Sequence, residues 1–297
     1  MTSPKTQILL LGAGELGTAF LPHLSALPNT HITIGIRSPS KYTHLQSPNI
    51  SLTAIDLSSP SPSLAKKFSA HDILISATGF GADPSSVLKL GEEVLLAGKI
   101  RKEERKGKLW FFPWQWGVDY DVIGDGEGLM PLFGAQRDVR NLLRRKAEES
   151  DVKWTVFWGI VDRSKEEEGT VVVRCLRDWN HKVTVTDVND IGRVLARVIA
   201  GDVEAEDRVL YIAGDTVSYG QLADIVKRVS GKQIEQEAWR IEHLKKELDS
   251  APEDGIKKYR LVFARDGVWW EMSRTVNKAL SMDMMDVETF AKSLFGR

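Results

Sequence analysis

The sequence contains a single cysteine, Cys175, and this scarcity excludes several classes of protein. One thiol cannot form an intramolecular disulfide, and a cysteine-based metal cluster needs several thiolates. No apolar run approaches the roughly 20 residues that a membrane-spanning helix needs. The first expected strand begins at Gln7, which leaves no room for the charged and apolar regions of a signal peptide. We therefore expect a cytoplasmic protein without a membrane partner.

The sequence also has no excess of charge of either sign. Its 297 residues include 40 lysines and arginines and 41 aspartates and glutamates, so the net charge is −1. Bulk electrostatics therefore give no reason to expect a nucleic-acid partner. The G-x-S-x-G nucleophile elbow, the H-E-x-x-H metal motif and the P-loop are missing as well. We expect a small-molecule substrate and no metal.

A glycine-rich turn is the most informative feature that the sequence does contain. The apolar run 7–11 leads directly into Gly12-Ala13-Gly14-Glu15-Leu16-Gly17, which is a G-x-G-x-x-G pattern between an expected strand and an expected helix. In such a turn the first glycine permits the tight bend, the second allows backbone to approach a pyrophosphate, and the third allows helix to pack on strand. The helix N-terminus would attract the same pyrophosphate, so residues 12 and 14–17 are expected to bind a dinucleotide.

The end of the second expected strand predicts which dinucleotide binds. Strand 31–36 is followed by Arg37, at the position where an NAD-specific site has an acidic residue for the ribose 2′-hydroxyl. Arg37, with Ser38 and Lys41 beside it, instead suits a 2′-phosphate, which arginine binds through paired charge-assisted hydrogen bonds. We therefore expect NADPH as the cofactor. Asp56, after the third strand, is either a partner for the adenine amino group or a surface residue.

Strand and helix patterns alternate through the first half of the chain. Apolar strands separated by helices favour a parallel sheet that is covered on both faces, and hence a Rossmann-type, doubly wound α/β fold. We expect residues 1–160 to form the NADP-binding domain. Residues 161–297 are expected to form a smaller substrate-side region, parts of which return to the main sheet. The expected strands are 31–36, 50–55, 72–76, 108–112, 153–158, 183–185 and 208–213, and the expected helices are 62–70, 84–100, 130–149, 188–200, 218–229 and 286–295.

Two loops follow strands at the edge of the sheet where doubly wound folds bind ligands. Residues 76–81 follow the fourth strand, and we expect Ala77, Thr78 and Gly79 to approach the nicotinamide half of the cofactor. After the fifth strand come residues 113–121. Their two tryptophans either pack in the core or form a wall for a flat aromatic substrate. The substrate residues expected from this loop are Trp114, Gln115, Trp116 and Asp119, with Tyr120 beside them.

Together the glycine turn, Arg37 with Lys41, and the run 111–119 resemble the NmrA-like family of atypical short-chain dehydrogenases. Its isoflavone reductase-like branch carries Phe-Phe-Pro-Ser-Glu-Phe-Gly after the fifth strand, whereas this chain has Trp-Gln-Trp in place of Ser-Glu-Phe. Fungal aromatic alcohol reductases are more similar, because they share the Trp-Gln version and a segment like Val183–Thr186. The resemblance implies an NADPH-dependent reductase that transfers hydride to a small aromatic or polyketide-like acceptor.

The resemblance also exposes a substitution at a catalytic position. The plant reductases use a lysine on the helix after this loop, and Gln136 stands at that position here. Gln136 falls inside the apolar stripe formed by residues 132, 135, 139, 143 and 147, with Arg140 on the margin of the stripe. Glutamine can polarise a carbonyl but cannot supply a proton near neutral pH. A positioned acid contributes about 10²–10⁴ in rate.

Three interpretations of Gln136 remain open. In the first, the protein is an enzyme that needs little acid catalysis, and Gln136 orients the acceptor. In the second, Tyr120 or another group supplies the proton. In the third, the protein binds NADP(H) without turnover as a redox sensor and signals through a protein partner. The Tyr-x-x-x-Lys motif of classical short-chain dehydrogenases is missing at the expected helix. His181 lies in a loop that either covers the substrate or is simply surface.

Overall fold

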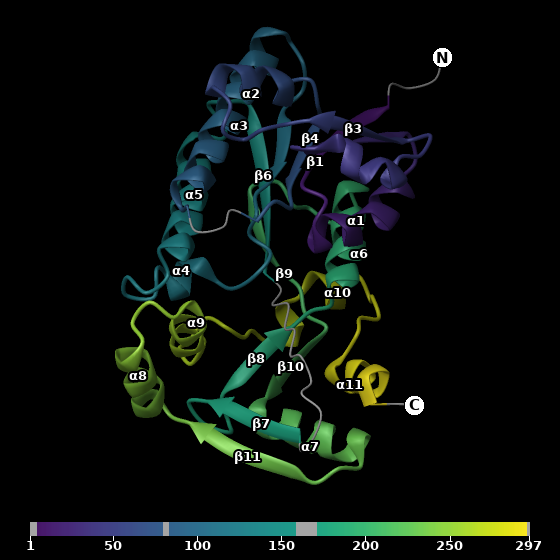
Figure 1. Cartoon of the computed structure of the whole chain (residues 1–297). Coiled ribbons are helices and arrows are strands. Elements are labelled where there is room, and N and C mark those ends of the chain that lie inside the picture. Colours follow the sequence, from purple (N-terminus) through teal and green to yellow (C-terminus); the bar gives the residue numbers. More distant parts are fainter. Residues whose placement is uncertain (1–4, 80–82, 159–170, 296–297) are drawn as a thin grey trace. The chain divides into compact units, whose positions relative to one another are not determined.

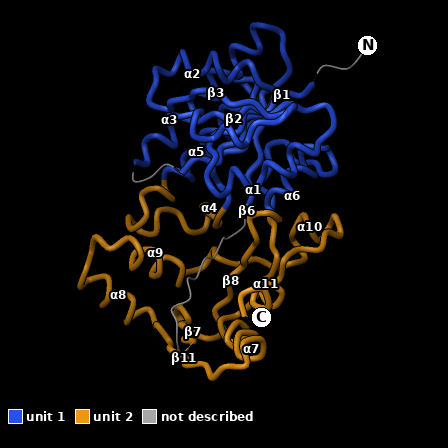
Figure 2. The backbone as a smooth tube through the Cα atoms, turned by 45° about the vertical axis from the view of Figure 1, so that its right-hand side comes forward, with its two compact units in different colours: residues 1–116, 135–157, 191–210 blue, residues 117–134, 158–190, 211–297 orange. Residues whose placement is uncertain are grey.

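The computed structural model describes residues 5–79, 83–158 and 171–295. Clustering of the backbone separates the chain into two compact units, coloured in Figure 2. Unit 1 contains residues 1–116, 135–157 and 191–210, and unit 2 contains residues 117–134, 158–190 and 211–297. The chain therefore passes repeatedly from one unit to the other, and each unit is built from segments that are distant in sequence.

Unit 1 is built on a seven-stranded sheet with the order β3-β2-β1-β4-β5-β6-β9. The first six of these strands pair in parallel, with Leu9 opposite Thr33 on one side and opposite Leu74 on the other. The central strands are buried on both faces, as their continuous apolar sequences predict. The strands are β1 (Thr6–Leu11), β2 (Thr30–Ile36), β3 (Ile50–Ala54), β4 (Ile73–Ser76), β5 (Leu109–Phe112), β6 (Val152–Trp158) and β9 (Arg208–Tyr211).

Helices cover both faces of this sheet (Figure 1). On one face lie α2 (Ser61–Phe68), α3 (Ser85–Glu103) and α5 (Pro131–Lys146), and Gly91 of α3 faces Val139 of α5. On the other lie α1 (Glu15–Ser25) and α6 (Val188–Ile199), where Gly192 of α6 comes so close to α1 that an added Cβ would lie 3.1 Å from the Ala19 carbonyl oxygen. A short 3-10 helix, η1 (Pro39–Leu45), follows β2.

Unit 2 contains two small sheets and a set of short helices. β8 (Lys182–Val185) pairs antiparallel with β10 (Asp215–Ser218), and β7 (Val171–Leu176) pairs in parallel with β11 (Ile234–Trp239). Asn277 of the short helix α10 (Val276–Ala279) is tied to the segment before β10, because its side chain exchanges two hydrogen bonds with the backbone of Ala213. The helices are α4 (Tyr120–Ile123), α7 (Tyr219–Ser230), α8 (Ile241–Ser250), α9 (Gly255–Phe263), η2 (Met272–Arg274), α10 (Val276–Ala279) and α11 (Val287–Phe295).

The expected Rossmann-type α/β fold is confirmed, and most expected elements end within a few residues of the predicted positions. A late segment of the chain, β9, lies beside β6 in the main sheet. In the described ranges, no helix combines the length and the apolar character needed to cross a membrane. Nor do the described residues gather three or more His, Cys, Asp or Glu side chains in a way that could hold a metal ion.

Candidate functional site

The glycine turn connects β1 to α1 and has three different steric requirements. Gly12 has a φ of +99°, and a Cβ there would lie 2.8 Å from Thr78 Oγ1. At Gly17 a Cβ would lie 2.2 Å from the Gly12 carbonyl oxygen, so helix and turn could not pack as they do. By contrast, a Cβ at Gly14 would meet no atom within 4 Å. Gly12 and Gly17 therefore shape the turn, whereas the surroundings of Gly14 leave space for a ligand group.

Glu15 and Leu16 form the first residues of α1, directly behind Gly14. The helix receives no side-chain capping bond at Gly14. The first N–H groups of a helix have no partner within it, and the helix dipole makes this end partly positive. An anionic group of a ligand could accept these hydrogen bonds, which fits the pyrophosphate expected from the sequence.

Arg37 follows the last residue of β2 and is exposed, as is Lys41 in η1. The structure describes no hydrogen bond or ion pair to either side chain. Because β1, β2 and β3 are parallel neighbours, the glycine turn, Arg37 and Asp56 all follow carboxyl ends at one edge of the sheet. These are the positions from which an adenosine 2′-phosphate would be bound.

Asp56 already has partners within its own loop. Its Oδ1 accepts hydrogen bonds from the backbone N–H and the hydroxyl of Ser58, at 3.0 and 2.8 Å. These bonds to Ser58 hold the pKa of the Asp56 carboxyl below its usual value, and the positive charge of Arg37 adds to the effect. The structure thus assigns Asp56 a role in ordering the loop after β3, and an adenine contact stays a prediction.

The loop after β4 begins beside the glycine turn. Ala77 is buried, and its backbone N–H donates to the carbonyl oxygen of Leu11 at 2.8 Å. Thr78 is partly exposed and Gly79 is exposed, with no atom within 4 Å of a Cβ placed on Gly79. These residues continue the open edge of the sheet past the glycine turn. Phe80 and Gly81, also expected here, lie outside the described residues.

Residues 114–116, in the loop after β5, differ in their surroundings. Trp114 is partly exposed, whereas Gln115 and Trp116 are buried. Trp116 Nε1 donates to the Ser76 carbonyl oxygen at 2.8 Å, and its ring stacks on Phe157 with the centroids 5.4 Å apart. Trp116 therefore packs in the core of unit 1, which was one of the two readings left open for these tryptophans.

Gln115 connects the loop to α5 through a buried network. Its amide nitrogen donates to the backbone carbonyl of Gln136 at 2.7 Å. Its amide oxygen accepts from the Arg140 guanidinium, through Nε at 3.1 Å and Nη2 at 2.9 Å. Arg140, expected on the margin of the apolar stripe, is completely buried. Helical periodicity alone does not predict this burial, because its hydrogen-bond partner Gln115 lies on another segment.

Gln136 is completely buried, as its place on the apolar stripe predicts. Its backbone carbonyl is used by Gln115, but neither its amide nitrogen nor its amide oxygen has a hydrogen-bond partner among the described residues. A buried amide without partners is costly, by about 1–3 kcal/mol for each group. A buried polar group without a partner needs an explanation, and a role in function is one such explanation.

Asp119, Tyr120 and His181 belong to unit 2. Asp119 caps α4, where its carboxylate accepts from the backbone N–H groups of Asp121 and Val122. Tyr120 is buried, and its ring packs edge-on against Phe133 at 5.3 Å. His181 is completely buried, and its Nε2 lies 3.0 Å from the Phe263 carbonyl oxygen. Burial lowers the pKa of His181 despite this bond, so the ring is neutral near pH 7.

Unit 2 also contains a cavity of about 410 Å³ that includes Asp119 in its lining. Its other walls come from residues that the sequence did not single out as a site, among them Tyr211, Trp269, Trp270 and Arg274. Only the adjacent tryptophans were visible in the sequence as an unusual feature. Their meeting with Tyr211 and Arg274 depends on the tertiary structure.

Known proteins resemble this chain over nearly its full length. Residues 4–291 match the model of the NmrA-like family. An NmrA-like family domain-containing oxidoreductase from Gibberella moniliformis (strain M3125 / FGSC 7600) is 33% identical over 310 residues, which cover 97% of each protein.

Two solved reductase structures have a similar fold. The pinoresinol-lariciresinol and phenylcoumaran benzylic ether reductase structures match with a TM-score of 0.77 and 17% identity, over 99% of this chain and 100% of the other. The binary complex of leucoanthocyanidin reductase with NADPH, from Vitis vinifera, matches with a TM-score of 0.73 and 16% identity, over 98% and 100%. At these identities the structures establish the fold, while the sequence matches establish the relationship. The chain belongs to the NmrA-like family.

Proposed function

We propose that this protein is an NADPH-dependent reductase that transfers hydride to a small aromatic or polyketide-like acceptor. The observation that carries the proposal is the edge of the unit 1 sheet, where the open turn at Gly14 and the exposed Arg37 follow adjacent parallel strands. The oxidoreductase relative and the NADPH complex of a structural neighbour support the same function.

The residues present fit the cofactor. Gly12, Gly14 and Gly17, with the N-terminus of α1, would bind the pyrophosphate, and Arg37 with Lys41 would bind the 2′-phosphate. Ala77, Thr78 and Gly79 would border the nicotinamide half. When bound, NADPH supplies the hydride, so the protein's own task is to position the acceptor and stabilise developing charge.

The choice between NADPH and NADH tests the role of Arg37. If Arg37 forms one or two charge-assisted bonds to the 2′-phosphate, Arg37→Ser weakens NADPH binding roughly ten- to hundredfold and leaves NADH binding unchanged. Dissociation constants from tryptophan quenching with NADPH, NADP⁺, NADH and NAD⁺ measure this directly. Arg145→Ser, at another exposed arginine of unit 1, is the matched control. Equal losses for NADPH and NADH would disprove the role of Arg37.

We propose further that the Gln136 amide acts on the acceptor by donating a hydrogen bond to its carbonyl oxygen. The support is that the amide is buried without a partner in the described structure. Gln136→Leu then removes two unsatisfied polar groups at similar volume, so the unfolding free energy stays the same or rises. Turnover of NADPH falls about tenfold or more, with little change in NADPH affinity. Full activity of Gln136→Leu would leave Gln136 with a structural role alone.

The alternative function is a sensor that binds NADP(H) without consuming it. It is favoured by the same residue, because Gln136 cannot donate a proton where the resemblance implies a lysine. If the protein is an enzyme, either the acceptor needs little acid catalysis, or Tyr120 or another group supplies the proton. A screen of aromatic carbonyl acceptors for NADPH oxidation separates the two functions. Binding of NADP(H) with no oxidation by any acceptor, together with a marked preference for NADP⁺ over NADPH, supports the sensor.

A further inference from the structure

The cavity in unit 2 has aromatic walls that are held in place from behind. The Trp270 ring is 3% exposed, and its Nε1 donates to the Ile212 carbonyl oxygen at 3.1 Å. Tyr211 meets Trp270 edge-on, with the centroids 5.6 Å apart. Trp269 is partly exposed, and Lys182 Nζ lies over its ring, 4.6 Å from the ring centroid. The volume of about 410 Å³ lies within the roughly 300–1,000 Å³ of small-molecule sites.

One charged side chain in the lining has no polar partner among the described residues. The carboxylate of Asp266 is paired with Arg177 Nη1 at 3.1 Å, and that of Asp119 is occupied in capping α4. The Arg274 guanidinium, in contrast, forms no ion pair or side-chain hydrogen bond with any residue that the structure describes. Its carbon lies 4.2 Å from the centroid of the Tyr211 ring. Stacking on a ring face leaves the in-plane N–H donors of a guanidinium available.

We propose that this cavity binds a planar aromatic carboxylate. The ring of the ligand packs against Trp269, Trp270 and Tyr211, and its carboxylate accepts paired hydrogen bonds from Arg274. An arginine fork matches a carboxylate in geometry as well as in charge, so the site discriminates between an acid and its neutral amide. The inference concerns binding alone and does not depend on the proposed reductase activity, because the experiment below contains no cofactor.

The test measures binding of 2-naphthoate and of neutral 2-naphthamide to the full-length protein by isothermal titration calorimetry. The wild-type protein binds 2-naphthoate about tenfold or more tightly than 2-naphthamide. Arg274→Gln removes this preference by weakening 2-naphthoate alone, and Arg274→Lys retains part of it because the charge remains. Trp269→Ala weakens both compounds, since both lose an aromatic wall.

Lys278→Gln is the matched control. Lys278 is exposed on α10, close in sequence to Arg274, and does not line the cavity, so the variant removes the same charge from the same unit. It leaves both affinities unchanged. The proposal is overturned if the wild-type protein does not bind 2-naphthoate, or if Arg274→Gln keeps the preference for the acid. Equal losses in Lys278→Gln and Arg274→Gln also overturn it, because they reflect net charge rather than a site.

Discussion

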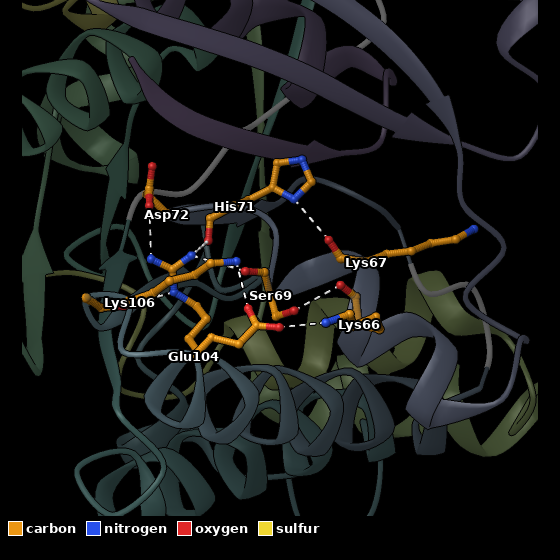
Figure 3. Close-up of polar contacts among 9 residues, drawn as sticks. Lys66, Lys67, Ser69, His71, Asp72, Glu104 and Lys106 are labelled. Carbon is orange, nitrogen blue, oxygen red and sulfur yellow. Dashed lines mark hydrogen bonds and ion pairs between the residues drawn. The ribbon is translucent and has the colours of Figure 1, made fainter. Parts of the chain in front are cut away.

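Replacement of Arg101 by methionine is expected to destabilise unit 1 without weakening cofactor binding. Arg101 lies in α3 and is 3% exposed. Its guanidinium donates to the carbonyl oxygens of Gly107, Ser69 and His71 and to the carboxylate of Asp72. Figure 3 labels Ser69, His71 and Asp72, which supply three of these four acceptors. The other carboxylate oxygen of Asp72 accepts from the Gln7 backbone N–H at 2.9 Å, so the network joins α3 to the amino ends of β1 and β4.

The loss of unfolding free energy in this variant depends on how many of the four acceptors can bind water in place of the guanidinium. Hydrogen bonds to a charged group contribute about 1.5–3 kcal/mol each, so four of them set an upper bound of about 6–12 kcal/mol. The Asp72 side chain is 44% exposed and Gly107 is exposed, so water replaces the guanidinium at these two. Ser69 is buried, so water does not replace the hydrogen bond that its carbonyl oxygen loses. The bonds that water does not replace then leave an expected loss of about 3–5 kcal/mol in unfolding free energy.

Urea unfolding followed by tryptophan fluorescence measures this loss. Lys99→Met is the control, because it removes a positive charge from an exposed position of the same helix and should change stability by less than about 0.5 kcal/mol. NADPH affinity under native conditions should stay within about twofold of wild type, since the network and the glycine turn lie at opposite ends of parallel strands. A loss below about 1 kcal/mol would show that water satisfies all four acceptors and refute the reasoning.

Two further predictions concern the glycine turn and His181. Gly17→Ala forces the backbones of residues 17 and 12 apart, so it should lower the melting temperature and abolish NADPH binding in a quenching titration. Gly14→Ala should weaken NADPH binding and leave the melting temperature unchanged, because a Cβ at residue 14 meets no atom within 4 Å. Equal melting temperatures in the two variants would contradict the packing described. His181 has a pKa below its ordinary value of 6.5 in the folded protein, so below about pH 6.5 the unfolded chain binds the proton more readily. The unfolding free energy therefore falls as the pH is lowered. His181→Phe should flatten this fall between about pH 7 and pH 5 in urea titrations, and an unchanged slope would argue against a neutral buried His181.

The sequence predicted unit 1 better than unit 2 for a physical reason. Strands of a parallel sheet are buried on both faces, so runs such as residues 72–76 are continuously apolar and visible without any alignment. β11 (Ile234–Trp239) was not predicted, because Glu235, Gln236 and Ala238 are exposed and its partner β7 is distant in the chain. The short helices α8 and α9 were missed as well. Their buried faces consist of few residues, chiefly Leu244, Leu248 and Leu261.

Within the candidate site, sequence patterns predicted the residues whose role depends on the backbone and missed those whose role depends on tertiary partners. The spacing of Gly12 and Gly17 encodes a close approach that the structure reproduces. Arg140 and Arg274 carry no comparable local signal. Arg140 donates hydrogen bonds to Gln115 and Arg274 stacks on Tyr211, and both partners come from other parts of the chain.

The interleaved path of the chain has a consequence for how the protein can be divided. Because the backbone changes unit after residues 116, 134, 157, 190 and 210, a fragment that ends near residue 160 includes a piece of unit 2 and lacks both α6 and β9. Loss of β9 turns β6 into an edge strand with unpaired backbone groups beside the buried side chains of Val156 and Phe157. Such an edge is a template for aggregation. A cofactor-binding fragment could therefore be obtained only by rejoining the three segments of unit 1, and simple truncation would yield an insoluble product.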